Sequence, residues 1–155
     1  MNLGNAFSRE AKIETFQRSF HAGRILHLFC GFTRPSPKEK FVVVGCAAPR
    51  PLVIVVNSEI REFVKRRPRL LVCQVMLSKN DYSCLHHDSY LDCSRAIDYF
   101  TQAIVENQVV RDMARIKMCL TKADTANVIK AIEAAETIPL RDKLWMLDEL
   151  KRTLN

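Results

Sequence analysis

Phe41-Val42-Val43-Val44-Gly45-Cys46 and Leu52-Val53-Ile54-Val55-Val56-Asn57 are the two apolar stretches that decide the fold of this 155-residue chain. Short runs rich in β-branched residues and bounded by turn signals are typical of strands. The residues between them include Pro49 and Pro51, which remove backbone donors and restrict the residues that precede them. The sequence therefore predicts two consecutive strands joined by a loop over residues 47–51.

Three further stretches of the same kind predict strands at Gly23–Gly31, Leu70–Leu77 and Ser89–Cys93. In the last of these, Tyr90 and Asp92 are expected to face away from Ser89, Leu91 and Cys93, because side chains alternate along a strand. Residues 33–38 contain two prolines and form a loop before the second strand. Between the third and fourth strands, Ser58 is a candidate N-cap for one or two helical turns that end before Pro68.

After residue 95 the spacing of apolar residues changes to three or four, which is typical of helices. One helix face is predicted at Ile97, Phe100 and Ile104, and another at Ile129, Ile132 and Ala135. Thr121 with Asp124 resembles a capping box at the start of the second of these helices. Pro139 suits the first turn of a last helix, whose apolar stripe is formed by Leu140, Leu144, Leu147 and Leu154.

The predicted fold class is α+β, with a β-barrel of about five strands and added helices in the C-terminal third. We expect a single domain over residues 1–155. It consists of an N-terminal extension (1–20) that forms a short helix packed on the barrel, the β unit (21–95) and the helical part (96–155).

The composition is close to that of globular proteins, with 48% hydrophobic and 26% charged residues. No apolar run approaches the roughly 20 residues that span a bilayer, and the start of the chain lacks a secretory pattern, so we expect a cytoplasmic protein without a membrane segment. The six cysteines contain no C-x-x-C pair and lie mostly in apolar runs. They are predicted to be reduced thiols that act as small hydrophobes.

The net charge of +7 favours polyanionic partners. The excess of positive charge lies in two groups. The first group is Arg61, Lys65, Arg66, Arg67 and Arg69, and the second is Arg34, Lys38 and Lys40. A solvated surface is an equally good interpretation of the first group. None of the four glycines forms a G-x-G pattern, so a nucleotide-driven enzyme is not expected.

Residues 84–95 concentrate reactive side chains, and several interpretations of them stay open. His86 and His87 suit proton transfer near neutral pH, although an exposed turn explains them as well. The spacing of Cys84, His86 and Cys93 is not that of a zinc site, so no metal and no cofactor are predicted. Cys93 alternates with Leu91, which favours a core thiol over a nucleophile.

Three segments, at residues 53–58, 89–94 and 115–121, occur in an order that resembles the PemK/MazF-like toxin family. The similarity covers roughly residues 20–135. It implies an SH3-like β-barrel with added helices and a metal-independent endoribonuclease that cuts single-stranded RNA. In place of the family's Gly-x-Glu-Gln loop and its Arg-Pro pair directly before the second strand, this chain has Arg34-Pro35 and Lys40.

The resemblance implies that Arg34 or Lys40, together with Ser58, lies near the scissile phosphate. His86 is our candidate for the acid or base, and the predicted RNA-binding residues are Arg61, Lys65, Arg66, Arg67, Arg69 and His87. The expected partners are RNA, an antitoxin protein and a second copy of the chain, packed through the last helix beside Trp145. The alternative is a non-catalytic barrel module that binds nucleic acid or a protein.

Overall fold

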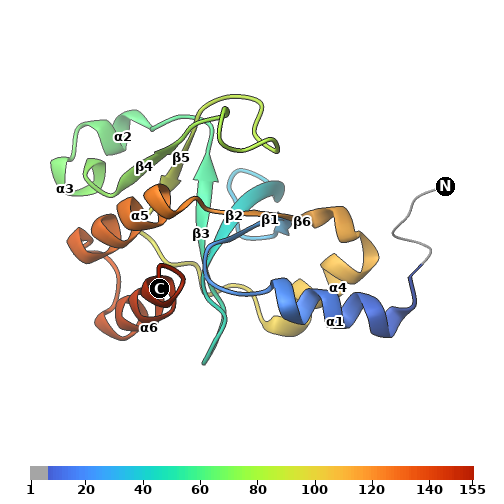
Figure 1. Cartoon of the computed structure of the whole chain (residues 1–155). Helices are drawn as coiled ribbons and strands as arrows, with labels where there is room; N and C mark the ends of the chain where they lie inside the picture. The colour runs from blue at the N-terminus through green and yellow to red at the C-terminus, as the bar shows by residue number, and fades with distance from the viewer. Residues whose placement is uncertain (1–6) are drawn as a thin grey trace.

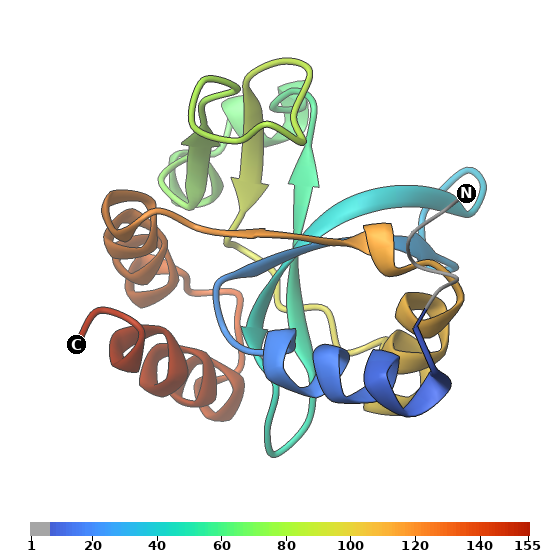
Figure 2. The same ribbon diagram turned by 45° about the vertical axis from the view of Figure 1, so that its right-hand side comes forward.

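The computed structural model describes residues 7–155, which form a curled antiparallel sheet with helices on both of its faces (Figures 1 and 2). The six strands lie in the order β4-β5-β3-β2-β1-β6 and curl into a half-barrel. Their bounds are β1 (Arg24–Cys30), β2 (Lys38–Cys46), β3 (Leu52–Asn57), β4 (Gln74–Leu77), β5 (Ser89–Asp92) and β6 (Ile116–Cys119). The predicted α+β class is confirmed.

The helices of the described residues are α1 (Arg9–Ser19), α2 (Glu62–Lys65), α3 (Pro68–Leu71), α4 (Gln102–Arg111), α5 (Lys122–Ala134) and α6 (Leu140–Arg152), with a 3-10 turn at Met113–Arg115. Helix α1 confirms the expected N-terminal helix, although residues 1–6 of the predicted extension lie outside the described residues. Within residues 7–155, none of the helices has both the length and the apolar character needed to cross a membrane.

The strand predictions at 23–31, 41–46, 52–57 and 89–93 are confirmed to within a few residues, whereas two others need correction. The predicted strand Leu70–Leu77 is wrong in its first half, because Pro68 suits the first position of a helix and begins α3. The sheet has six strands and not about five. Strand β6 is partly exposed along its whole length and shows no alternation, so its sequence carries little strand signal.

Two helix starts and one apolar stripe differ from the predictions. Ile97 forms an isolated bridge to Val53, and α4 begins only after the N-cap Thr101. Helix α2 begins after Arg61, so Ser58 is not its N-cap. In α6, Leu140 and Leu144 are 69% and 56% exposed, and the buried face is formed by Met146, Leu147 and Leu150. Of the predicted stripe, Leu147 belongs to the buried face, whereas Met146 and Leu150 are absent from the prediction. Dimerisation through α6 stays a prediction.

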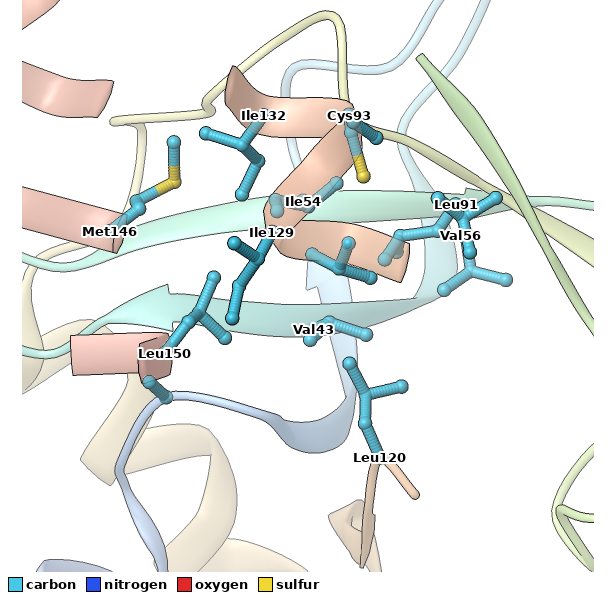
Figure 3. Packing of buried hydrophobic residues seen from close by; sticks show 14 of the residues in the cluster. Val43, Ile54, Val56, Leu91, Cys93, Leu120, Ile129, Ile132, Met146 and Leu150 are labelled. Atoms are coloured by element: carbon cyan, nitrogen blue, oxygen red, sulfur yellow. The ribbon is translucent and has the colours of Figure 1, made fainter. Parts of the chain in front are cut away.

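Both faces of the sheet are apolar, because alternate residues of each strand enter one of two cores. Helices α5 and α6 cover one face, where Ile129, Ile132, Met146 and Leu150 pack on strand residues such as Val43 and Ile54 (Figure 3). Helices α1 and α4 cover the opposite face, and their contribution includes Phe16, Phe20, Val105 and Val109. All six cysteines are free, and four of them are buried, namely Cys30, Cys46, Cys73 and Cys93.

Gly45 lets helix α6 approach strand β2, and Gly45→Ala is expected to destabilise the fold by about 1–3 kcal/mol. A Cβ at this position would lie 2.5 Å from Met146 Sδ and 2.9 Å from its Cγ. Urea unfolding measures the cost. In a Met146→Ala background the same substitution should cost clearly less, because both Met146 atoms are gone and only the Leu52 carbonyl oxygen, 3.3 Å away, stays close. Equal costs in the two backgrounds would contradict this contact.

Candidate functional site

A row of polar side chains crosses four neighbouring strands of the sheet and lines a cavity to which α1 and α4 contribute no residue. It consists of Lys40 on β2, Asn57 on β3, Asp92 on β5 and Gln74 on β4, and we call it the polar row. All four residues are half-buried. The row arises from register: Val42 pairs with Val55, which places Lys40 opposite Asn57, and Gln74 pairs directly with Asp92. Paired residues of antiparallel strands share a face of the sheet.

Hydrogen bonds link the members of the polar row in two pairs. Lys40 Nζ donates to Asn57 Oδ1 over 2.6 Å. Gln74 Nε2 donates to Asp92 Oδ1 over 2.9 Å and to the Leu70 carbonyl over 3.2 Å. Asp92 Oδ1 also accepts from the backbone N–H and the hydroxyl of Ser94 over 3.1 and 2.5 Å. These bonds fix the side chains before any ligand arrives.

The polar row is part of the lining of a cavity of about 600 Å³. Five cationic side chains line it against two acidic ones, Glu59 and Asp92. The cations come from the β1–β2 loop, the start of β2, the β3–α2 connection and the segment after β5, and they are Arg34, Lys38, Lys40, Arg61 and Arg95. Phe32 and Phe63 add aromatic surface. The cavity therefore combines a cationic lining with apolar walls, as expected for a site that takes an anionic organic ligand.

Lys40 is the most deeply placed of these cations. Burial lowers the pKa of Lys40, and the neighbouring charges of Arg61 and Lys38 lower this pKa further, against the opposing effects of Cys30 and Asp92. An ammonium that has lost part of its water gains more than an exposed one from an arriving anion. Lys40 is thus the cation best placed to hold a negative charge inside the cavity.

Three of the predicted site residues, Arg34, Lys40 and Arg61, meet in this cavity although the sequence separates them. The other predicted catalytic residues do not line it: Ser58 is exposed beyond the end of β3, and His86 is exposed in the β4–β5 loop. His87 lies in the same loop, where its Nδ1 is 3.3 Å from Ser89 Oγ. The cavity and the histidine turn are therefore separate features of the structure.

Most of the first basic group gathers at a second hollow of about 570 Å³ beside the cavity. Arg66, Arg67 and Arg69 line it, and it shares Leu70 and Thr137 with the cavity. Arg69 forms an exposed ion pair with Glu136, and Lys65 forms another with Glu62. Exposed ion pairs of this kind contribute little free energy, so Arg69 and Lys65 remain available to bind a polyanion. The two hollows adjoin at these shared residues, and Glu136 also lines the second one.

The sequence interpretation missed Asn57, Gln74, Asp92, Phe63 and Arg95 as parts of the site. A signal existed for Asp92, since its strand alternates and places it away from the core with Tyr90. For Asn57 and Gln74 the deciding information is strand register. It brings Asn57 to Lys40, 17 positions away in the sequence, and Gln74 to Asp92, 18 positions away. For Phe63 the sequence indicates only an ordinary helix residue.

Within residues 7–155, no three side chains of His, Cys, Asp or Glu are arranged so that they could hold a metal ion. Neither a protein-family model nor a curated protein sequence matches this chain.

Proposed function

We propose that the protein is a PemK/MazF-like, SH3-like-barrel protein that binds RNA in the Lys40 cavity and acts as a metal-independent endoribonuclease. The observation that carries the proposal is the convergence of Arg34, Lys40 and Arg61 in one cavity with Lys38 and Arg95. Cations dominate the recognition of a phosphate backbone. The adjoining hollow with Arg66, Arg67 and Arg69 extends the same charge, which supports a chain-like polyanion over a single small anion.

RNA cleavage without a metal needs a base for the ribose 2′-hydroxyl, a cation for the charge that develops on phosphorus, and a donor for the leaving oxygen. In this proposal Arg34 and Lys40 supply the positive charge. The roles of Ser58 and His86 stay predictions, because neither side chain lines the cavity. His86→Ala and Ser58→Ala in the assay below measure these roles directly.

The second candidate function is a non-catalytic barrel module that binds nucleic acid or an acidic protein through the same surface. It is favoured by the separation of the histidine turn from the cavity, since this leaves the cavity without an imidazole. An acidic antitoxin would compete with RNA for Arg34, Lys40 and Arg61 in either case.

A cleavage assay in EDTA separates the two candidates. We expect the purified protein to cut an end-labelled single-stranded RNA in EDTA, and Arg34→Ala to slow the cut about 100-fold, the effect of losing one charge-stabilising donor. Lys12→Ala, a change on α1 outside the cavity, is the matched control and should cut normally. RNA that is bound but left intact would overturn the nuclease and favour the module. RNA that is neither bound nor cut would contradict the nuclease and every RNA-binding form of the module.

A further inference from the structure

We infer that the cavity holds one unpaired guanine base of its RNA ligand, stacked on Phe63 and read along its hydrogen-bonding edge by the polar row. This inference rests on the proposed RNA binding and adds to it a base preference. It follows from the atoms that the polar row leaves free, from the position of Phe63 and from the charge around them.

The amide of Asn57 is oriented by Lys40. An ammonium group can only donate hydrogen bonds, so the atom 2.6 Å from Lys40 Nζ must be the carbonyl oxygen Oδ1. The Nδ2 group of Asn57 is therefore the atom left for a ligand, and it is a donor. Because Asn57 lines the cavity, it contributes one donor there.

The amide of Gln74 is oriented in the opposite sense. Its Nε2 faces two groups that only accept, the Leu70 carbonyl and Asp92 Oδ1, so its free atom is the acceptor Oε1. Asp92 Oδ1 is occupied by Gln74 and by two donors of Ser94, and no donor among residues 7–155 is bonded to Oδ2. Asn57, Gln74 and Asp92 thus offer a ligand two acceptors and one amide donor, and the Lys40 ammonium keeps N–H donors beyond the one it gives to Asn57.

Guanine is the base whose edge complements this set. Along its Watson–Crick edge it presents the acceptor O6 and two donors, N1–H and the N2 amino group. Uracil presents a single donor between two acceptors. Adenine and cytosine each present one amino group beside ring or carbonyl acceptors. Only guanine presents two donor groups side by side, so it alone satisfies both protein acceptors while its O6 accepts from Asn57 or Lys40. The other bases leave one protein acceptor unpaired, and an unpaired buried polar atom is costly.

Phe63 supplies a surface for stacking. Its side chain is 59% exposed and lines the cavity. The guanidinium carbon of Arg67 lies 3.5 Å from the centroid of its ring, while Arg67 itself lines the neighbouring hollow. Arg67 therefore occupies one face of the ring and leaves the other for a base. Stacking on an aromatic side chain is sequence-tolerant and contributes about 1–3 kcal/mol per base.

The cations around the cavity account for the rest of the nucleotide. Arg34, Arg61 and Arg95 line the same space as the polar row and Phe63, so phosphates on either side of the base would meet positive charge. Asp92 and Glu59 are the exceptions, since carboxylates repel phosphate. Recognition of a base explains why the Asp92 carboxylate lies among these cations.

Fluorescence anisotropy with labelled single-stranded octamers of uridine tests the inference. Each octamer carries one central nucleoside: guanosine, inosine, adenosine, cytidine or an abasic ribose. Wild-type protein should bind the guanosine octamer at least tenfold more tightly than the adenosine octamer, since a good bidentate contact discriminates by about 1–3 kcal/mol. Inosine, which lacks the N2 amino group, should lie between them. Equal binding of guanosine, inosine and adenosine would overturn the inference.

Two variants separate recognition of the guanine edge by hydrogen bonds from stacking of the base on Phe63. Asp92→Asn keeps an oxygen for Gln74 and Ser94 but places a donor where Oδ2 lies, so the guanosine preference should disappear while the adenosine octamer still binds. Phe63→Ala should weaken the guanosine octamer about tenfold, whereas Phe29→Ala, an exposed phenylalanine of β1 outside the cavity, should change nothing. A guanosine preference that survives Asp92→Asn would overturn the role of the polar row. Failure of every octamer to bind would instead overturn the proposed RNA binding itself.

Discussion

Lys40→Met is expected to weaken RNA binding about 30-fold or more and to abolish RNA cleavage. The substitution keeps most of the aliphatic stem but removes a half-buried ammonium that lines the cavity and donates to Asn57 Oδ1. Removing one partner of a desolvated, hydrogen-bonded charge pair at an interface costs about 2–5 kcal/mol. It also leaves Asn57 Oδ1 without its donor. Anisotropy titration with single-stranded RNA measures the loss.

Lys117→Met is the matched control for this prediction. Lys117 lies on β6, is likewise partly buried and does not line the cavity. Lys117→Met removes the same charge from the protein as Lys40→Met. It should lower RNA affinity only slightly, because it weakens only the long-range electrostatic field. If the two variants lost affinity equally, the effect would belong to net charge and the assignment of the cavity would be wrong.

Tyr82→Ala is expected to cost about 3–5 kcal/mol of unfolding free energy, the range for deleting a large buried aromatic side chain. Tyr82 is fully buried. Its hydroxyl donates to Asp124 Oδ2 over 2.5 Å and accepts from the Thr121 backbone N–H over 3.1 Å. It ties the β4–β5 loop to the start of α5, where Thr121 is the N-cap. The expected loss is a large share of the roughly 5–15 kcal/mol that stabilises a typical domain. Urea unfolding measures this loss.

Tyr82→Phe tests the hydroxyl separately through pH. Burial and the hydrogen bond to Asp124 raise the pKa of Tyr82 to about 12. The unfolded chain, with a tyrosine pKa near 10, loses this proton first. The contribution of the phenol is therefore complete below pH 10 and is lost as the pH rises from 10 to 12, by roughly 3 kcal/mol. The buried thiols titrate in both proteins, so the difference between wild type and Tyr82→Phe isolates the phenol. Parallel pH profiles would contradict this assignment.

Strands were predictable from the sequence where apolar residues run together between turn signals. Leu52–Asn57 matches β3 residue for residue, and the alternation around Leu91 correctly placed Tyr90 and Asp92 away from the core. Prediction failed where tertiary contacts decide. Strand β6 is held by its pairing with β1 and has no pattern of its own, and Ile97 continues a helical spacing yet bonds to Val53.

The candidate site, like the strands, was predictable only in part. Charge identified the two basic groups and the family resemblance singled out Arg34 and Lys40, which the fold brings together with Arg61. The polar row depends on which residue of one strand lies opposite which residue of the next, and register is not encoded in any local stretch. The reactive segment at residues 84–95 was misleading as a unit, because its histidines lie in an exposed loop while Asp92 points toward the cavity lining.

The salt dependence of RNA binding tests the central claim, that the Lys40 cavity is a binding site for a phosphate backbone. The affinity of wild-type protein for a single-stranded RNA is measured between 50 and 200 mM salt, and compared with that of an Arg34→Ala, Lys40→Ala double variant. Each phosphate contact contributes about −0.7 to the slope of log K against log salt for single strands. We predict that the double variant loses affinity and that its slope is shallower by about 1.4. An unchanged affinity and slope would contradict the claim.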